Sequence, residues 1–207
     1  LKDCDPYLRF VFLTGITKFS QLSIFSELNN ISNISMKDDY AGICGITETE
    51  LLDDMQDGIA GLAQANELTP RQVVAKLKEN YDGYHFSAHS PGVFNPFSLL
   101  SSLANKDFDS YWFASGTSTY LVNMLQRFNV QPASLQRMCA KSSAFDSPTE
   151  TMKTITPLLY QSGYITIKGY DKISQLYTLD LPNKEVKVGL FESLLPNYLD
   201  GSDAEQG

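Results

Sequence analysis

Two segments of the chain combine residue types that could bind or activate a substrate. The first is Thr14-Gly15-Ile16-Thr17-Lys18, which places two hydroxyl groups and an ammonium group directly after a short apolar run. Polar groups at the C-terminal edge of a strand in an open α/β sheet can approach a bound ligand such as a phosphate. A plain turn from a strand to a loop would show the same residue types, so both interpretations stay open.

The second segment is Tyr81-Asp82-Gly83-Tyr84-His85-Phe86, which gathers three aromatic rings, a carboxylate and an imidazole around a glycine. Such a loop could order an acid/base pair or stack on a base. Aromatic residues that follow a helix-ending glycine also commonly pack beneath the helix. His85 and His89 are the only histidines, and they lie in a loop without helical metal-ligand spacing, so we expect no metal site.

Motifs for hydrolysis are missing from the sequence. There is no GxxxxGK[ST] loop to cradle phosphates and no GxSxG elbow for a nucleophilic serine. The adjacent carboxylates Asp38-Asp39 and Asp53-Asp54 would diverge on a helix or strand, so they are not placed to share one substrate. We therefore expect no catalytic residue and no cofactor in this chain.

The composition is that of a globular protein, with 43% hydrophobic and 19% charged residues among 207. A net charge of -8 argues against a surface that wraps nucleic-acid phosphates. Three cysteines, Cys4, Cys44 and Cys139, are far apart and indicate neither a disulfide framework nor a zinc site. No apolar run has the length of a membrane span. We expect a cytoplasmic location and no membrane partner.

The pattern of elements predicts a mainly α (α+β) fold. The run from Leu8 to Thr14 is almost continuously apolar, as in a strand buried in a parallel sheet. Such a strand needs neighbours, and no alternation of strands and helices follows to supply them. The rest of that sheet is expected before residue 1, so the chain is expected to be part of a longer protein.

Helices are predicted over most of the middle of the chain. Thr47 with Glu50 and Thr69 with Gln72 form two capping boxes, and Asn95 and Thr117 or Ser118 open two more helices. On the first of these helices, the apolar residues predicted to recur on one face are Leu51, Met55, Ile59 and Leu62. The apolar residues predicted to face inward on the third and fourth helices are Phe97, Leu100, Leu103, Leu121, Met124, Leu125 and Phe128.

The last third is predicted as helix, hairpin and helix, the order found in winged-helix units. A capping box at Ser147 to Glu150 opens a helix that ends at Gly163, and alternating runs at 165–168 and 177–181 form the hairpin. The strand residues expected to be buried are Ile165, Ile167, Leu179 and Leu181. A closing helix follows Pro182-Asn183, with Val188 and Phe191 among its predicted core residues.

Five segments in order resemble the predicted AAA-ATPase-like family, over nearly the whole chain. They are Phe12 to Ser20, Tyr81 to Phe86, Asn95-Pro96-Phe97-Ser98, Tyr111-Trp112 with Ser115-Gly116, and Leu181-Pro182-Asn183-Lys184-Glu185-Val186. The resemblance implies a P-loop core that binds ATP and Mg before this chain, and a nuclease domain that often follows it. It places Thr14, Thr17 and Lys18 at a nucleotide-sensing position. Family members often carry Arg or Lys at position 85, so no catalytic role is assigned to His85.

The resemblance divides the chain into the end of an ATPase core (1–35), a helical lid region (36–145), a winged-helix-like region (146–200) and a disordered tail (201–207). The expected function is that of a sensor and lid, whose partners are the P-loop core and nuclease domain of the same chain. Two alternatives stay open. The hairpin wing could bind nucleic acid through Lys168, Lys172, Lys184 and Lys187, or the chain could be a protein-docking scaffold.

We expect the purified chain to show no ATP hydrolysis and no nuclease activity, because it lacks a residue set that binds magnesium and phosphate together. Phosphate release and nicking of plasmid DNA would be measured. Activity that copurifies with the chain through a second, independent purification would contradict this prediction.

Overall fold

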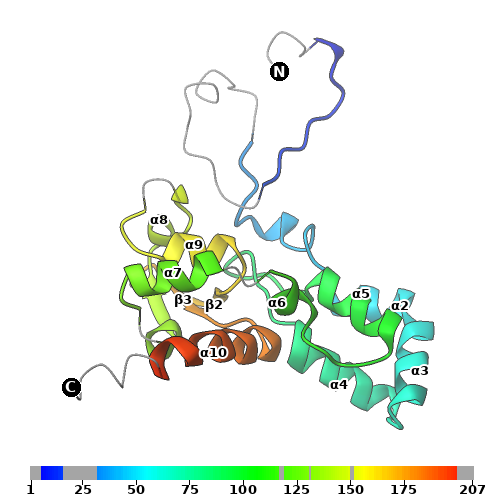
Figure 1. The fold of residues 1–207 in the computed structure, drawn as a ribbon. Coiled ribbons are helices and arrows are strands. Elements are labelled where there is room, and N and C mark those ends of the chain that lie inside the picture. Colours follow the sequence, from blue (N-terminus) through cyan, green and yellow to red (C-terminus); the bar gives the residue numbers. More distant parts are fainter. Residues whose placement is uncertain (1–5, 16–31, 117–118, 131, 150–151, 200–207) are drawn as a thin grey trace.

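The computed structural model describes residues 6–15, 32–116, 119–130, 132–149 and 152–199. Within these ranges the chain is a mixed α/β protein with nine α-helices and one three-stranded antiparallel sheet. Its buried side chains form two core clusters, and we call the elements around them the helical lobe and the sheet lobe (Figure 1). Among the described residues, no helix has the length and apolar character of a membrane span.

The helical lobe consists of four helices. They are α2 (Glu48–Asp54), α3 (Gln56–Ala65), α4 (Pro70–Tyr81) and α5 (Pro96–Asn105). Both predicted capping boxes are confirmed, since the Thr47 and Thr69 side chains each accept from a backbone amide three residues on, and their own amides donate to the side chains of Glu50 and Gln72. Asn95 caps α5 by accepting from the amides of Phe97 and Ser98. Local sequence thus sets where these helices begin.

The predicted continuous helix after Thr47 is wrong, because the chain breaks at Met55 between α2 and α3. In an unbroken helix the Gln56 amide would donate to the Leu52 carbonyl. Here the Gln56 side chain donates to that carbonyl instead, at 3.2 Å. The break still leaves Leu51 and Ile59 buried in the same core cluster.

The buried face of α5 differs from the predicted one. Phe97 and Leu100 were predicted to face inward, yet they are 52% and 49% exposed. The face that packs inward carries Ser98, Leu99 and Ser102, all 0% exposed. Buried serines are tolerated because each finds a partner: the Ser98 hydroxyl donates to Glu185 and the Ser102 hydroxyl donates to the Asp107 carbonyl.

The sheet lobe surrounds a sheet in the order β1-β3-β2. Its strands are β1 (Met138–Ala140), β2 (Thr166–Asp171) and β3 (Leu176–Asp180), and its helices are α7 (Thr119–Arg127), α8 (Ser142–Phe145), α9 (Thr156–Gln161) and α10 (Lys184–Leu199). The predicted hairpin of β2 and β3 is confirmed, and so is the burial of Ile165, Ile167, Leu179 and Leu181. Strand β1 was not predicted; it is only three residues long and pairs with β3.

Two predicted features of the last third are wrong. The helix expected from Ser147 begins instead at Thr156, where Pro157 occupies its first turn. The Gln161 side chain donates to the Ser147 carbonyl at 2.6 Å, which ties residue 147 to the far end of α9. On α10, Val188 is 43% exposed, whereas Val186 and Leu190 are buried.

The elements between the lobes and before them complete the described chain. Helix α6 (Tyr111–Gly116) contacts α5 of the helical lobe and α10 of the sheet lobe. The short 3-10 helices are η2 (Asp38–Tyr40) and η3 (Pro132–Leu135). The core cluster of the sheet lobe takes residues from both sides of the expected boundary at 145, and that boundary stays a prediction.

The strand predicted from Leu8 to Thr14 does not form in the described part of the chain, and its expected neighbours before residue 1 stay a prediction. Residues 10–15 have no regular secondary structure and extend away from the two lobes (Figure 1). Phe10 is 81% exposed and Leu13 is 51% exposed. A strand cannot form without a paired neighbour, and no strand of the described ranges pairs with this run.

The two adjacent leucines of α5 test the assignment of its faces. We expect Leu99→Ala to lower the free energy of unfolding by about 2–5 kcal/mol, because it leaves a cavity in the core. We expect Leu100→Ala to lower it by less than about 1 kcal/mol, because that side chain is half exposed. Urea unfolding followed by circular dichroism would measure both. Equal losses, or a larger loss at Leu100, would contradict the assignment.

Candidate functional site

The segment from Tyr81 to Phe86 joins the two lobes. Tyr81 is 0% exposed in the core of the helical lobe, and its hydroxyl donates to the Asp109 carbonyl at 2.7 Å. Tyr84 is 7% exposed and belongs to the core of the sheet lobe. Only two residues lie between the two tyrosines in the sequence. This segment therefore fixes the lobes to each other at short range, and we call the region around it the junction.

Gly83 lies between the two rings in a conformation that side chains rarely adopt, with φ of 99°. A Cβ atom at this position would clash with the carbonyl oxygen of Pro182. Glycine is thus required both by the backbone angle and by the close approach of the chain that leads into α10.

Lys168 of strand β2 links the backbone at Gly83 to the backbone at Pro182. The pairing of β2 with β3 shifts between Ile167 and Gly169, so Lys168 occupies a bulge that changes the direction of its side chain. Its Nζ donates to the Gly83 carbonyl at 2.7 Å and to the Pro182 carbonyl at 2.9 Å. Desolvation lowers the pKa of Lys168, and the carboxylates of Asp180 and Asp82 oppose that change.

Glu185 connects three helices at the junction. It is 4% exposed and lies in the first turn of α10. Its Oε2 accepts from the Ser98 hydroxyl of α5 at 2.7 Å, and its Oε1 accepts from the Trp112 amide of α6 at 2.7 Å. Burial raises the pKa of Glu185, and these hydrogen bonds act in the opposite direction.

Two helix-capping asparagines lie near the Tyr84 hydroxyl. Asn95 caps α5, and Asn183 accepts from the Val186 amide at the start of α10. Burial raises the pKa of Tyr84, and the side-chain amides of Asn95 and Asn183 oppose the rise. Within the described residues, the Tyr84 hydroxyl and Asn183 Nδ2 are buried and make no hydrogen bond that meets normal geometry. The polar contacts between the two caps are therefore incompletely satisfied in this arrangement.

His85 is held by its backbone and by its ring. Its amide donates to Thr166 Oγ1 at 2.8 Å, and the Thr166 hydroxyl donates to the His85 carbonyl at 2.9 Å. Its Nδ1 lies 2.9 Å from the Ser90 carbonyl. Asp82 accepts from the Gly83 amide, and no group of His, Cys, Asp or Glu suited to a metal ion occurs in the described ranges. These contacts tie His85 to β2 through Thr166 and to the loop that contains Ser90.

A cleft of about 450 Å³ opens beside the junction, between α4, the 106–110 loop and α10. Its charges are mixed: Lys184 pairs with Glu79 at 3.2 Å, and Lys76 lies over the Phe108 ring. Glu185 and Glu192 also line it. Carboxylates and ammonium groups in such proximity neutralise each other, so the cleft does not favour a phosphate.

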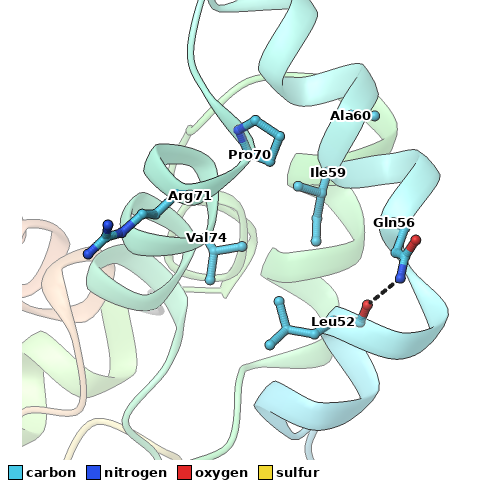
Figure 2. Close-up of a pocket in the computed structure, with 7 residues that line it drawn as sticks. All are labelled: Leu52, Gln56, Ile59, Ala60, Pro70, Arg71 and Val74. Carbon is cyan, nitrogen blue, oxygen red and sulfur yellow. Dashed lines mark hydrogen bonds between the residues drawn. The ribbon is translucent and has the colours of Figure 1, made fainter.

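A second hollow of about 510 Å³ lies on the helical lobe, between α2, α3 and α4 (Figure 2). We call it the groove, and its lining residues are Leu52, Gln56, Ile59, Ala60, Pro70, Arg71 and Val74. Leu52, Ile59 and Val74 point toward one another across it, whereas the Arg71 side chain extends away from them (Figure 2). The groove is therefore apolar inside and has a cation at one edge.

The structure brings most of the predicted segments together. Four of the five segments that carry the family resemblance meet at the junction, through Gly83, Ser98, Trp112, Pro182 and Glu185. In the fifth segment, Thr14 is exposed, and Thr17 and Lys18 lie outside the described residues.

Sequence reasoning missed the roles of Ser98, Lys168 and Glu185. Ser98 and Glu185 lie inside quoted segments, so an isolated polar residue next to an apolar run was a signal that could have found them. Lys168 carried no such signal, because the bulge that aims it depends on strand pairing.

We expect Glu185→Ala to lower the free energy of unfolding by about 2–4 kcal/mol, because the Ser98 hydroxyl and the Trp112 amide would lose their buried acceptor. Glu192→Ala, at an exposed position of the same helix, is the matched control and should change it by less than about 1 kcal/mol. Trp112 is the single tryptophan, so its fluorescence reports on the junction during urea unfolding. Similar losses in both variants would contradict the role of Glu185.

Stability should also depend on pH through this group. Because the pKa of Glu185 is raised above its ordinary 4.5, its contribution to stability is complete below that pH and is lost as the pH rises through the raised pKa. The difference in unfolding free energy between the wild-type chain and Glu185→Gln should therefore change between pH 4.5 and the raised pKa of Glu185. Above that pKa it should become constant. A difference that stays constant across this pH range would show that Glu185 has the same pKa in both states.

Comparison with known proteins finds one longer relative. The chain is 33% identical over 201 residues to an uncharacterized protein in the vnfD 5' region of Azotobacter chroococcum mcd 1. The match covers 96% of this chain and 37% of that protein, so the chain spans little more than a third of its relative's length. No family model and no solved structure matches the chain. The relative is itself uncharacterized and assigns no activity to this chain.

Proposed function

We propose that this chain is the sensor, lid and winged-helix portion of an AAA-like P-loop ATPase and that it responds to the nucleotide state of the longer protein without hydrolysing ATP itself. The observation that carries the proposal is the junction. Four segments that resemble the family lie far apart in the sequence, yet each takes part in a hydrogen bond of Glu185 or Lys168 where the lobes meet. A region that couples two lobes is what a nucleotide-responsive lid requires.

The exposed apolar run supports the same proposal. Leu8, Val11 and Phe12 are 40%, 41% and 46% exposed, in a segment whose composition suits the interior of a parallel sheet. A run of this kind is a poor solvent-facing surface and a good partner for a neighbouring strand. The length of the relative leaves room for a P-loop core that would supply that strand.

Roles within the longer protein follow from the proposal. Thr14, Thr17 and Lys18 would lie at the edge of the core sheet and sense the terminal phosphate. ATP and Mg would be held by residues outside this chain. The junction would transmit the resulting movement to the hairpin and α10, which would contact the core or a following nuclease domain.

The proposal is tested on the full-length parent protein. Lys18→Ala should lower the rate of ATP hydrolysis about tenfold or more while ATP binding is retained, as expected for a group that acts on the transferred phosphate. Lys37→Ala, at an exposed position, is the control and should leave the rate unchanged. Failure of the parent to bind ATP, or equal rates in the two variants, would overturn the proposal.

Nucleic-acid binding by the hairpin wing is less favoured by the contacts of its lysines. Lys168 donates to two backbone carbonyls, and Lys184 pairs with Glu79, so two of the four candidate cations are already engaged. Residues 138–207 contain no arginine, the side chain best suited to reading guanine edges.

We therefore expect the chain to bind duplex DNA no more tightly than other acidic proteins do. Phosphate contacts dominate such binding. Each lysine or arginine contact that is removed reduces the slope of the logarithm of the binding constant against the logarithm of salt concentration by about one. Electrophoretic mobility shifts at physiological salt would measure it, with Lys172→Ala and Lys187→Ala as the informative variants. A micromolar or tighter complex with duplex DNA that both substitutions weaken would contradict this prediction and favour nucleic-acid binding by the hairpin.

A further inference from the structure

The groove on the helical lobe has the form of a helix-packing seam that lacks its third helix. Its first wall presents Leu52 from α2 and Gln56, Ile59 and Ala60 from α3. The opposite wall is the first turn and a half of α4.

Leu52 is the residue that makes the groove an exposed apolar surface. It is 42% exposed although it adjoins Leu51, which is 0% exposed. Figure 2 shows Leu52 and Val74 on opposite walls, pointing toward each other with Ile59 above them. An apolar side chain inserted between Leu52 and Val74 would remove the exposed part of Leu52 from water.

The segment that supplies the α2 and α3 wall of the groove is acidic, whereas the α4 wall carries the cation Arg71. Residues 38–70 contain eight acidic residues and no Lys or Arg. Asp53 and Asp57 directly follow the lining residues Leu52 and Gln56, so they stand about 100° around the helix from them, beside the groove. Both are exposed, and neither takes part in an ion pair within the described ranges.

Arg71 marks the other edge of the groove. It lies in the first turn of α4, where the helix dipole disfavours a cation. No ion pair of the described residues involves its guanidinium group. The α4 edge is thus the one part of the rim that would repel a basic partner.

From these observations we propose that the groove docks one face of an amphipathic helix whose flanking residues are basic. The apolar face fills the space between Leu52, Ile59 and Val74. Its basic residues lie over Asp53 and Asp57 and away from Arg71. This is the helix-in-groove mode of recognition, in which apolar anchors give affinity and the rim charges select the partner. The proposal does not depend on the ATPase assignment.

The test uses two fluorescein-labelled peptides with leucines at the same helical spacing, one with lysines and one with glutamates at the remaining positions. Fluorescence anisotropy with the 207-residue chain should show binding of the lysine peptide and at least about tenfold weaker binding of the glutamate peptide. Leu52→Gln should weaken binding of the lysine peptide about tenfold. Leu100→Gln, a similarly exposed leucine on α5, is the matched control and should leave it unchanged.

Charge variants separate specific docking from general attraction to an acidic protein. Asp53→Asn with Asp57→Asn should weaken the lysine peptide about threefold, and Arg71→Glu should strengthen it by a similar factor. Equal effects of Leu52→Gln and Leu100→Gln, or equal binding of both peptides, would overturn the proposal. So would a small apolar dye that binds in a Leu52-dependent way and is not displaced by the lysine peptide, since that result would assign the groove to a small ligand.

Discussion

Burying the Glu185 carboxylate removes it from water, and a charge in such a place is tolerated only where donors surround it. The Ser98 hydroxyl and the Trp112 amide supply those donors from two different helices. Neither helix can move away from α10 without leaving the carboxylate unsatisfied. The positions of α5, α6 and α10 relative to one another are thus tied to one side chain, and through them the helical lobe is tied to the sheet lobe.

The backbone of the junction is also held by polar contacts between distant segments, here between one lysine and two carbonyl groups. Gly83 lets the chain turn through a positive φ beside the Pro182 carbonyl, where any Cβ would clash. Lys168 then donates to the carbonyls of both residues. Because a carbonyl without a donor is costly once buried, the three groups hold one another in place. The aromatic residues on either side complete the arrangement by packing into separate cores.

Outside the junction, the described surface offers two apolar features that the fold itself does not use. One is the run from Leu8 to Leu13, and the other is the groove lined by Leu52, Ile59 and Val74. Both expose side chains that would gain free energy from burial.

The sequence by itself determined the local features, because their energetics depend on residues close together in the chain. Helix starts at Thr47, Thr69 and Asn95 are examples, since each cap bonds to an amide within three residues. The hairpin follows in the same way from alternation and a short connection. Tertiary structure decided the rest. The inward face of α5 carries two serines that only distant partners can satisfy, so hydrophobicity alone selected the wrong side.

Dependence on residues far away in the sequence also explains the other differences between the predicted and the observed structure. Strand β1 has three residues and is held by its pairing with β3, which no local pattern encodes. Lys168 is aimed at the junction by a bulge that exists only when β2 and β3 are in register. The apolar run from Leu8 to Leu13 has the composition of a strand but remains unpaired in the described chain, because a strand's hydrogen bonds come from its neighbours and not from its own residues.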